Sequence, residues 1–113
     1  IHRSASGHGQ VELTDDPPVQ SCLPSVDYLF NSLAESFGAQ TLPVIMTGMG
    51  YDGAEGSRKL HQLGGPVIAQ DEASCVVFGM PRKPVDEGYA DVVAPLNTIA
   101  AEIVRFTGRR ARA

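Results

Sequence analysis

The sequence has few of the residues that mark metal-binding, secreted or membrane-spanning proteins. Its 113 residues include two cysteines, three histidines and no tryptophan. Cys22 and Cys75 are isolated, without C-x-x-C spacing, and the histidines have no metal-ligand spacing, so no disulfide framework or zinc site is supported. No apolar run approaches the roughly 18 residues of a membrane-spanning helix, and no leader pattern stands at the start. We therefore expect no metal, no cofactor, no membrane insertion and a location in the cytoplasm.

Positive charge is also scarce. Nine basic residues against 13 acidic ones give a formal net charge of −4, which provides no broad electrostatic surface for nucleic acid. The basic cluster of Arg109, Arg110 and Arg112 lies at the end, and we interpret residues 109–113 as a frayed basic tail. The 42% of hydrophobic residues against 19% charged is typical of a globular core, so we expect one small domain or part of one.

The first third of the chain predicts a hairpin followed by a helix. The segment S-A-S-G-H-G-Q is typical of an exposed hairpin tip, and Val11 and Leu13, which alternate with polar residues, indicate the hairpin's second strand. Pro24 and Ser25 then start a helix with Ser25 as its N-cap, and Gly38 ends it.

The rest of the chain alternates between short apolar runs and helical patterns. Strands are expected at residues 42–47, 66–69 and 91–94, and helices at 54–63, 82–87 and 97–106, the last capped by Asn97 and ended by Gly108. Strand, turn, helix and strand in this order form a right-handed βαβ unit. The fold class predicted is therefore α/β: a partial doubly wound, Rossmann-like, mostly parallel sheet with flanking helices, preceded by a β-hairpin segment.

The turn that follows the strand expected at residues 42–47 contains the candidate functional residues. Residues 42–56 read L-P-V-I-M-T-G-M-G-Y-D-G-A-E-G, in which three glycines allow a sharp turn and Asp52 is the one carboxylate inside it. Such turns, at the carboxyl ends of parallel strands, are where open α/β sheets bind ligands.

One interpretation of this turn is nucleotide binding. Gly48, Gly50 and Gly53 match G-x-G-x-x-G between a strand and a helix, and Asp71 or Glu72 follows about 20 residues later, as in dinucleotide-binding folds. Asp52 argues against this interpretation, because two charges about 4 Å apart repel by roughly 4 kcal/mol at an effective dielectric near 20.

A second interpretation uses the carboxylate itself. An acid at a strand end can orient a histidine that deprotonates a nucleophile, which would make Asp52 the third member of a catalytic triad. Alternatively, Asp52 caps the helix that begins at Gly53, for about 1 kcal/mol. The residues alone favour the cap over the catalyst, and one side chain can do both.

Three separated motifs carry a resemblance to a known family. They are P-S-V-D-Y-L-F, T-G-M-G-Y-D-G-A-E-G and I-A-Q-D-E-A-S-C-V-V-F-G-M-P-R. In their order and spacing, which extend through nearly the whole chain, they resemble the C-terminal part of the catalytic domain of the CheB-type chemotaxis protein-glutamate methylesterases.

The resemblance implies a doubly wound α/β domain that hydrolyses glutamate methyl esters on chemotaxis receptors, and in some members deamidates glutamines, by a serine-hydrolase mechanism. It implies that Asp52 is the triad aspartate, that Met49 and Gly50 line the active site, and that residues 70–82 border the cleft. The implied partners are methyl-accepting chemotaxis receptors and a receiver domain of the full-length protein.

The chain also departs from the family pattern. The family's nucleophilic serine, in a G-A-S-x-G-G turn, and its histidine both lie upstream of residue 1, and the serines of Ser4-Ala5-Ser6 lie in a hairpin tip instead. We therefore expect this C-terminal portion of the domain to be inactive alone and to self-associate through uncovered apolar surfaces. A non-enzymatic nucleotide-binding or receptor-interaction module is the alternative function.

Overall fold

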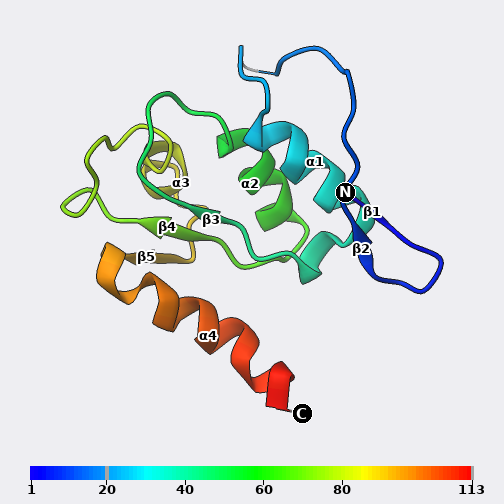
Figure 1. Ribbon diagram of the computed structural model, residues 1–113. Helices are drawn as coiled ribbons and strands as arrows, with labels where there is room; N and C mark the ends of the chain where they lie inside the picture. Colours follow the sequence, from blue (N-terminus) through cyan, green and yellow to red (C-terminus); the bar gives the residue numbers. More distant parts are fainter. Residues whose placement is uncertain (20, 113) are drawn as a thin grey trace.

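A three-stranded parallel sheet forms the centre of the molecule (Figure 1). The computed structural model describes residues 1–19 and 21–112, with side chains up to residue 108. The strands β3 (Val44–Ile45), β4 (Ile68–Gln70) and β5 (Val92–Ala94) lie in the order β3-β4-β5. A separate antiparallel hairpin, formed by β1 (His2–Arg3) and β2 (Gly9–Gln10), precedes them.

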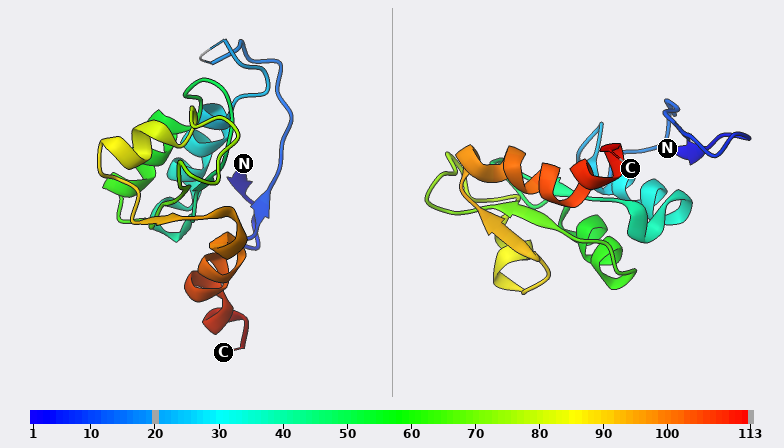
Figure 2. Two further views of the ribbon diagram at one scale, coloured as in Figure 1. Left: turned by 90° about the vertical axis from the view of Figure 1, so that its left-hand side faces the viewer. Right: turned by 90° about the horizontal axis from the view of Figure 1, so that it is seen from below.

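The helices lie on both sides of this sheet. Helices α1 (Val26–Ser36), α2 (Ala54–Gln62) and α3 (Arg82–Asp86) lie on one side, and α4 (Leu96–Arg112) lies on the other (Figures 1 and 2). A short 3-10 turn, η1 (Gly38–Gln40), follows α1. The predicted α/β fold with a parallel sheet, flanking helices and a preceding hairpin is confirmed.

The core lies between α1, α2 and β3. Phe30 of α1, Ile45 of β3 and Leu60 of α2 form one buried cluster. The central strand β4 is buried throughout, as expected for an apolar strand covered on both faces. Helix α4 buries Ile99 near its start, whereas Val104 is 61% exposed. The turn that follows β3 therefore connects two elements that both contribute to the buried cluster.

The expectation that Val11 and Leu13 lie in the hairpin's second strand is wrong. The hairpin closes through Ser4 N–H to His8 O, and its register pairs His2 with Gln10. The paired residues of β2 end at Gln10, and the side chains of Val11 and Leu13 are both exposed. The chain instead runs along α1, where these residues line a cavity.

The bounds of the last helix also differ from the prediction. Helix α4 begins at Leu96, so Asn97 lies inside its first turn rather than before it. The helix continues past Gly108 to Arg112, because one glycine costs only about 1 kcal/mol relative to alanine within a helix. The backbone of residues 109–112 is therefore helical rather than a frayed tail, and residue 113 and the side chains of the basic cluster lie outside the described residues.

Within residues 1–19 and 21–112, no helix combines the length and the apolar character that a bilayer crossing needs.

Candidate active site

Asp52 lies in the turn that connects β3 with α2. The chain leaves β3 after Ile45 and enters α2 at Ala54. Gly50 and Gly53 have φ angles of +83° and +97°, a left-handed conformation that glycine adopts at low cost. The turn therefore reverses tightly and directs the Asp52 carboxylate inward, where the residue is only 7% exposed.

The Asp52 carboxylate binds the N-terminus of α1. Its Oδ2 accepts a hydrogen bond from Val26 N–H at 2.7 Å, and its Oδ1 accepts one from Asp27 N–H at 2.9 Å. The Ser25 hydroxyl also donates to Oδ1 at 2.9 Å. Because the first amides of a helix have no partner within the helix, a carboxylate is well placed there.

The interpretation of Asp52 as the cap of its own helix is therefore wrong. The N-cap of α2 is Gly53, and no side-chain hydrogen bond caps that residue. Asp52 is instead a cap supplied by a distant segment, because the packing of α1 against α2 brings the start of α1 to the turn. Ser25 is the N-cap of α1, as predicted, and its side chain accepts a hydrogen bond from Tyr28 N–H.

These hydrogen bonds keep Asp52 ionised. Burial by itself raises the pKa of the carboxyl group, but the Asp27 and Val26 amides and the Ser25 hydroxyl lower it further than burial raises it. The result is a pKa below the ordinary value of 3.8. A buried carboxylate that stays charged at neutral pH can orient and stabilise a neighbouring cation.

The remaining predicted site residues, Met49 and Gly50, lie on the outer side of the same turn. Met49 is 84% exposed, and an ideal Cβ built on Gly50 would meet no heavy atom within 4 Å. Tyr51 is half exposed, and the Lys83 ammonium lies 4.6 Å from the centre of its ring. The turn thus presents one buried anion and an open apolar rim.

The loop between β4 and α3 packs against this turn. Gly48 N–H donates to Val77 O at 3.1 Å, and Thr47 Oγ1 accepts a hydrogen bond from Val77 N–H at 2.9 Å. An ideal Cβ on Gly79 would lie 2.5 Å from Gly48 O and 2.9 Å from Gly50 O, so a glycine is required there. Gln70, fully buried, accepts a hydrogen bond from Thr47 N–H through Oε1 at 2.8 Å.

The cysteine beside Asp52 is not a thiolate. Burial and the Asp52 charge both raise the pKa of the Cys22 thiol, and a thiol rather than a thiolate is a poor nucleophile. Both cysteines are free.

The three histidines make their polar contacts away from Asp52. Nδ1 of His2 lies 3.2 Å from Glu12, Nδ1 of His8 lies 3.0 Å from the Ser6 hydroxyl, and Nδ1 of His61 lies 3.6 Å from Asp91. Nor do the described residues include a group of three or more His, Cys, Asp or Glu side chains arranged to hold a metal ion.

Two residues of this site are not singled out by the sequence. Asp27 lies in the first turn of α1, and its carboxylate Oδ1 accepts Gly56 N–H from α2 at 2.7 Å. Gln70 is expected only as part of the segment 70–82 that borders the cleft, yet its side chain binds the Thr47 backbone. Gly56 is a signal that could have revealed the first contact, because a glycine inside a helix often marks a close approach of two elements.

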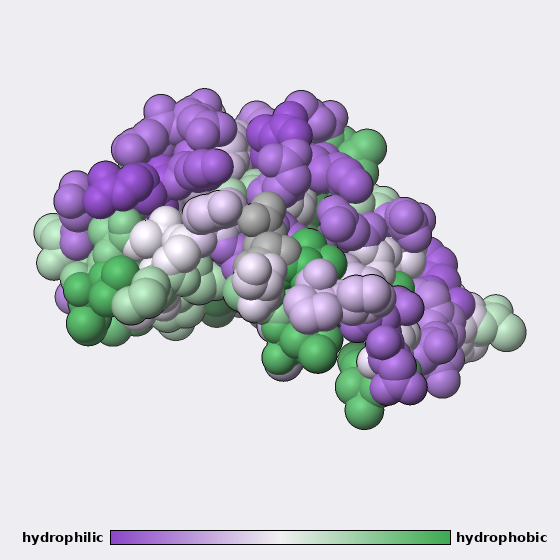
Figure 3. All heavy atoms as spheres, turned by 90° about the horizontal axis from the view of Figure 1, so that it is seen from above, coloured by the Kyte–Doolittle hydropathy of each residue, from purple (hydrophilic) through white to green (hydrophobic). Residues whose placement is uncertain are grey.

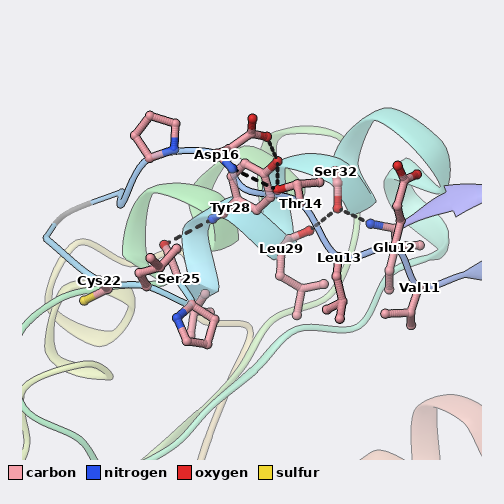
Figure 4. A pocket seen from close by; sticks show the side chains of 15 residues that line it. Val11, Glu12, Leu13, Thr14, Asp16, Cys22, Ser25, Tyr28, Leu29 and Ser32 are labelled. Atoms are coloured by element: carbon pink, nitrogen blue, oxygen red, sulfur yellow. Dashed lines mark hydrogen bonds between the residues drawn. The ribbon is translucent and has the colours of Figure 1, made fainter.

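A cavity of about 380 Å³ lies beside the site, between α1 and residues 11–17 (Figure 4). Ser25 and Cys22 line its end near Asp52, and Leu13 and Leu29 supply apolar surface. The Tyr28 hydroxyl, hydrogen-bonded to Thr14 and Asp16, ties the segment to α1 (Figure 4). The space-filling view from above shows exposed hydrophobic patches among hydrophilic side chains (Figure 3).

Comparison with known proteins identifies the family of this site. A family model described as CheB methylesterase matches residues 2–103. The chain belongs to the CheB methylesterase family. A curated relative from Desulfotalea psychrophila, named protein-glutamate methylesterase/protein-glutamine glutaminase, is 52% identical over 104 residues, covering 89% of this chain and 29% of the relative. A Rhizobium meliloti relative with the same activities in its name is 47% identical, covering 93% of this chain and 30% of the relative.

A solved structure agrees with this assignment. The crystal structure of the Thermotoga maritima CheB methylesterase catalytic domain matches with a TM-score of 0.78 and 40% sequence identity. The match covers 81% of this chain and 49% of the T. maritima chain. The chain thus spans about 30% of the length of its curated relatives and about half of a CheB catalytic domain.

Proposed function

We propose that this chain is the C-terminal portion of the catalytic domain of a cytoplasmic protein-glutamate methylesterase, and that Asp52 is the aspartate of its Ser-His-Asp triad. The substrates would be glutamate methyl esters, and also glutamines, of methyl-accepting chemotaxis receptors. The observation that carries the proposal is a buried, ionised carboxylate in the strand-end turn of a CheB-family chain.

The hydrogen-bond geometry leaves a place for a histidine. A carboxylate offers about four lone-pair positions, two on each oxygen. Oδ1 of Asp52 accepts two hydrogen bonds, from Ser25 and Asp27, whereas Oδ2 accepts one, from Val26. The Cys22 thiol, a weak donor, also contacts this carboxylate. An imidazole ring whose N–H replaces this thiol or takes the remaining position on Oδ2 would be held in one tautomer, and the imidazolium would be stabilised.

The chemistry proposed for the whole domain follows from that contact. A serine hydroxyl attacks the ester carbonyl while the histidine takes its proton, and the histidine then returns that proton to the departing methanol. Water hydrolyses the resulting acyl enzyme and restores the serine. In this scheme Asp52 exchanges no proton, and Met49 and Gly50 line the site beside it.

The α2 N-terminus offers little support for the alternative function of nucleotide binding. A phosphate would need free amides there, but Gly56 N–H donates to Asp27 and Ala54 N–H donates to Tyr51 O. Asp71, one of the two acids expected for a ribose, accepts hydrogen bonds from the backbone and hydroxyl of Ser74.

A complete domain would test the proposal. The half of the T. maritima domain that this chain does not match can be joined to residues 1–113, and methanol release from methylated receptor membranes measured. We expect activity, and a loss of about 10⁴-fold in kcat for Asp52→Asn, as for a triad acid neutralised in serine proteases. Asp91→Asn is the matched control, since Asp91 accepts Val67 N–H at 2.8 Å at the opposite, amino-terminal ends of the strands. A folded chimera without activity, or Asp52→Asn activity near wild type, would contradict the proposal.

The 113 residues alone should release no methanol above the buffer rate, because the serine and histidine of the triad are supplied by another part of the domain. Methanol release by the isolated chain that disappears in Asp52→Asn would show that this division of the triad is wrong.

We also propose that the isolated chain self-associates through the surface around the cavity. Leu13 is 94% exposed and Leu23 is 68% exposed, which is unusual for neighbouring leucines in a soluble domain. Sedimentation velocity should show a larger species at higher protein concentration, and Leu13→Gln should weaken it. A concentration-independent monomer would contradict self-association.

A receiver domain in the full-length protein remains part of the proposed function, and limited proteolysis of that protein tests for it.

A further inference from the structure

Asp27 contacts both Asp52 and the helix that follows Asp52. Its backbone N–H donates to Asp52 Oδ1 at 2.9 Å, and its own carboxylate Oδ1 accepts Gly56 N–H at 2.7 Å. The residue is 2% exposed. Asp27 of α1 thus makes hydrogen bonds to two parts of the site, the Asp52 carboxylate and the first turn of α2.

The two helices touch closely at this point. A Cβ on Gly56 would lie 2.5 Å from Phe30 Cβ and 3.1 Å from Asp27 Oδ1, so only glycine fits. The N-cap residue Gly53 has no side chain that could accept the first amides of α2, and Asp27 supplies a side-chain acceptor for this end of the helix. Without that acceptor, the Gly56 amide would be buried with no partner, and the first turn of α2 would shift or fray.

We propose that Asp27 is a positioning residue for Asp52, holding the first turn of α2 against α1 so that the Asp52 carboxylate keeps its place at the α1 N-terminus. This inference rests on the proposed function in taking Asp52 as the triad aspartate. Asp27 itself contacts neither substrate nor reacting atoms in this assignment.

The pKa shifts of Asp27 and Asp52 agree with a positioning role for Asp27 and a charged role for Asp52. Burial raises the pKa of Asp27 despite the Gly56 and Gly53 amides, and the charges of Asp52 and Glu55 raise it further. Among the described residues, Asp27 Oδ2 has no hydrogen-bond partner. Asp27 therefore takes a proton before Asp52 does, and Asp52 keeps its charge. Oδ1 accepts the Gly56 amide in either state, so asparagine should replace Asp27 in this role.

Amide hydrogen exchange in the 113-residue chain tests the positioning without any activity. Val26 N–H donates to Asp52 Oδ2 and reports whether the carboxylate is in place. We expect Asp27→Ala to speed Val26 exchange at least tenfold after correction for intrinsic rates, and Asp27→Asn to change it less than threefold. Asp91→Ala, which removes a similar carboxylate-to-amide contact at the other end of the sheet, should leave Val26 unchanged. If Asp27→Ala does not fold, Asp27→Ser, which is too short to reach Gly56, carries the same expectation.

Protection of Val26 within threefold of wild type in Asp27→Ala or Asp27→Ser would overturn the proposal. So would an Asp27→Asn variant that exchanges as fast as Asp27→Ala, because the acceptor at Oδ1 would then be irrelevant.

Turnover in the complete chimeric domain separates this inference from the proposed function. Per folded molecule, we expect Asp27→Ala to lower kcat at least tenfold with KM within twofold, and Asp27→Asn to restore kcat to within threefold of wild type. A purely structural role would lower the melting temperature and leave kcat per folded molecule unchanged. If Asp52→Asn is inactive while Asp27→Ala is fully active, only the positioning role fails. If Asp52→Asn is active, the proposed function fails.

Discussion

Asp52 binds the first turn of α1, the helix that contains Asp27, and Asp27 binds the first turn of α2, the helix that follows Asp52. Asp52, two residues before α2, accepts the amides of Val26 and Asp27 at the start of α1. Asp27, in the first turn of α1, accepts the Gly56 amide of α2. Both helix N-termini thereby gain a carboxylate, which complements the unpaired amides and the positive end of the helix dipole.

The two carboxyl groups should give opposite dependences of stability on pH. The lowered pKa of Asp52 means that its contribution is present above the ordinary value of 3.8 and is lost as pH falls through the lower folded pKa. The raised pKa of Asp27 means that its contribution is complete below 3.8 and is lost as pH rises through the folded pKa.

Urea unfolding at stepped pH values measures both contributions. The difference in unfolding free energy between wild type and Asp27→Asn should grow in favour of wild type as pH falls from 7 to about 4. The difference for Asp52→Asn should stay constant over that range and shrink at lower pH. Parallel curves for wild type and both variants would contradict the assignment.

Ser25→Ala should destabilise the chain by about 1 kcal/mol, because it removes an N-cap acceptor for Tyr28 N–H and a donor to Asp52 Oδ1. The same change should raise the pKa of Asp52, whose ionised form loses one hydrogen bond. Denaturant unfolding and carboxyl carbon NMR titration measure the two effects. Ser36→Ala is the control, since Ser36 lies at the far end of α1 and donates to Ser32 O. It should leave the Asp52 titration unchanged, and an unchanged titration in Ser25→Ala would be evidence against the hydroxyl contact.

Tyr89 makes a hydrogen bond to the first residue of α2. Its hydroxyl donates to Ala54 O at 3.1 Å, and burial raises the pKa of Tyr89 to about 12. The stability that it contributes is complete below the ordinary pKa of 10 and is lost as pH rises through about 12.

Ultraviolet titration should therefore show a tyrosine with a pKa of about 12 that is absent from Tyr89→Phe. The variant should also lose about 1 kcal/mol of unfolding free energy, since one buried hydrogen bond is removed. Tyr51→Phe, at a half-exposed residue, should change stability by no more than about 0.5 kcal/mol. Equal effects of the two substitutions would count against a buried Tyr89 hydrogen bond.

The elements near the site could be predicted because their signals are local. Each apolar run is bordered by glycine or proline, Ser25 precedes a helical pattern, and Asp52 stands in a glycine-rich turn. The partner of Asp52 could not be predicted in this way. Its contact with Val26 joins residues 26 positions apart and exists only because α1 packs on α2.

At the two ends of the chain, local signals do not determine the structure. Val11 and Leu13 have the alternation of a strand, but alternation alone does not establish pairing, and the paired residues of β2 end at Gln10. Gly108 resembles a helix end, yet a glycine stops a helix only when the backbone that follows turns away.

Gly79→Ala tests whether the loop before α3 holds the glycine turn in shape. The added Cβ would lie 2.5 Å from Gly48 O and 2.9 Å from Gly50 O, and backbone atoms cannot move aside as a flexible side chain can. We expect a loss of about 1–3 kcal/mol in unfolding free energy. In the complete chimeric domain we also expect at least a tenfold fall in kcat, about 1.4 kcal/mol, because the turn that carries Asp52 would shift.

Gly9→Ala is the matched control for this substitution. Its Cβ would lie 3.3 Å from the Phe37 ring, which can shift by a few tenths of an ångström, so both stability and kcat should stay close to wild type. If Gly79→Ala lowers stability while kcat per folded molecule is unchanged, the loop supports the fold but does not set the position of the turn. If both quantities are unchanged, the close approach of Gly79 to the turn is itself wrong.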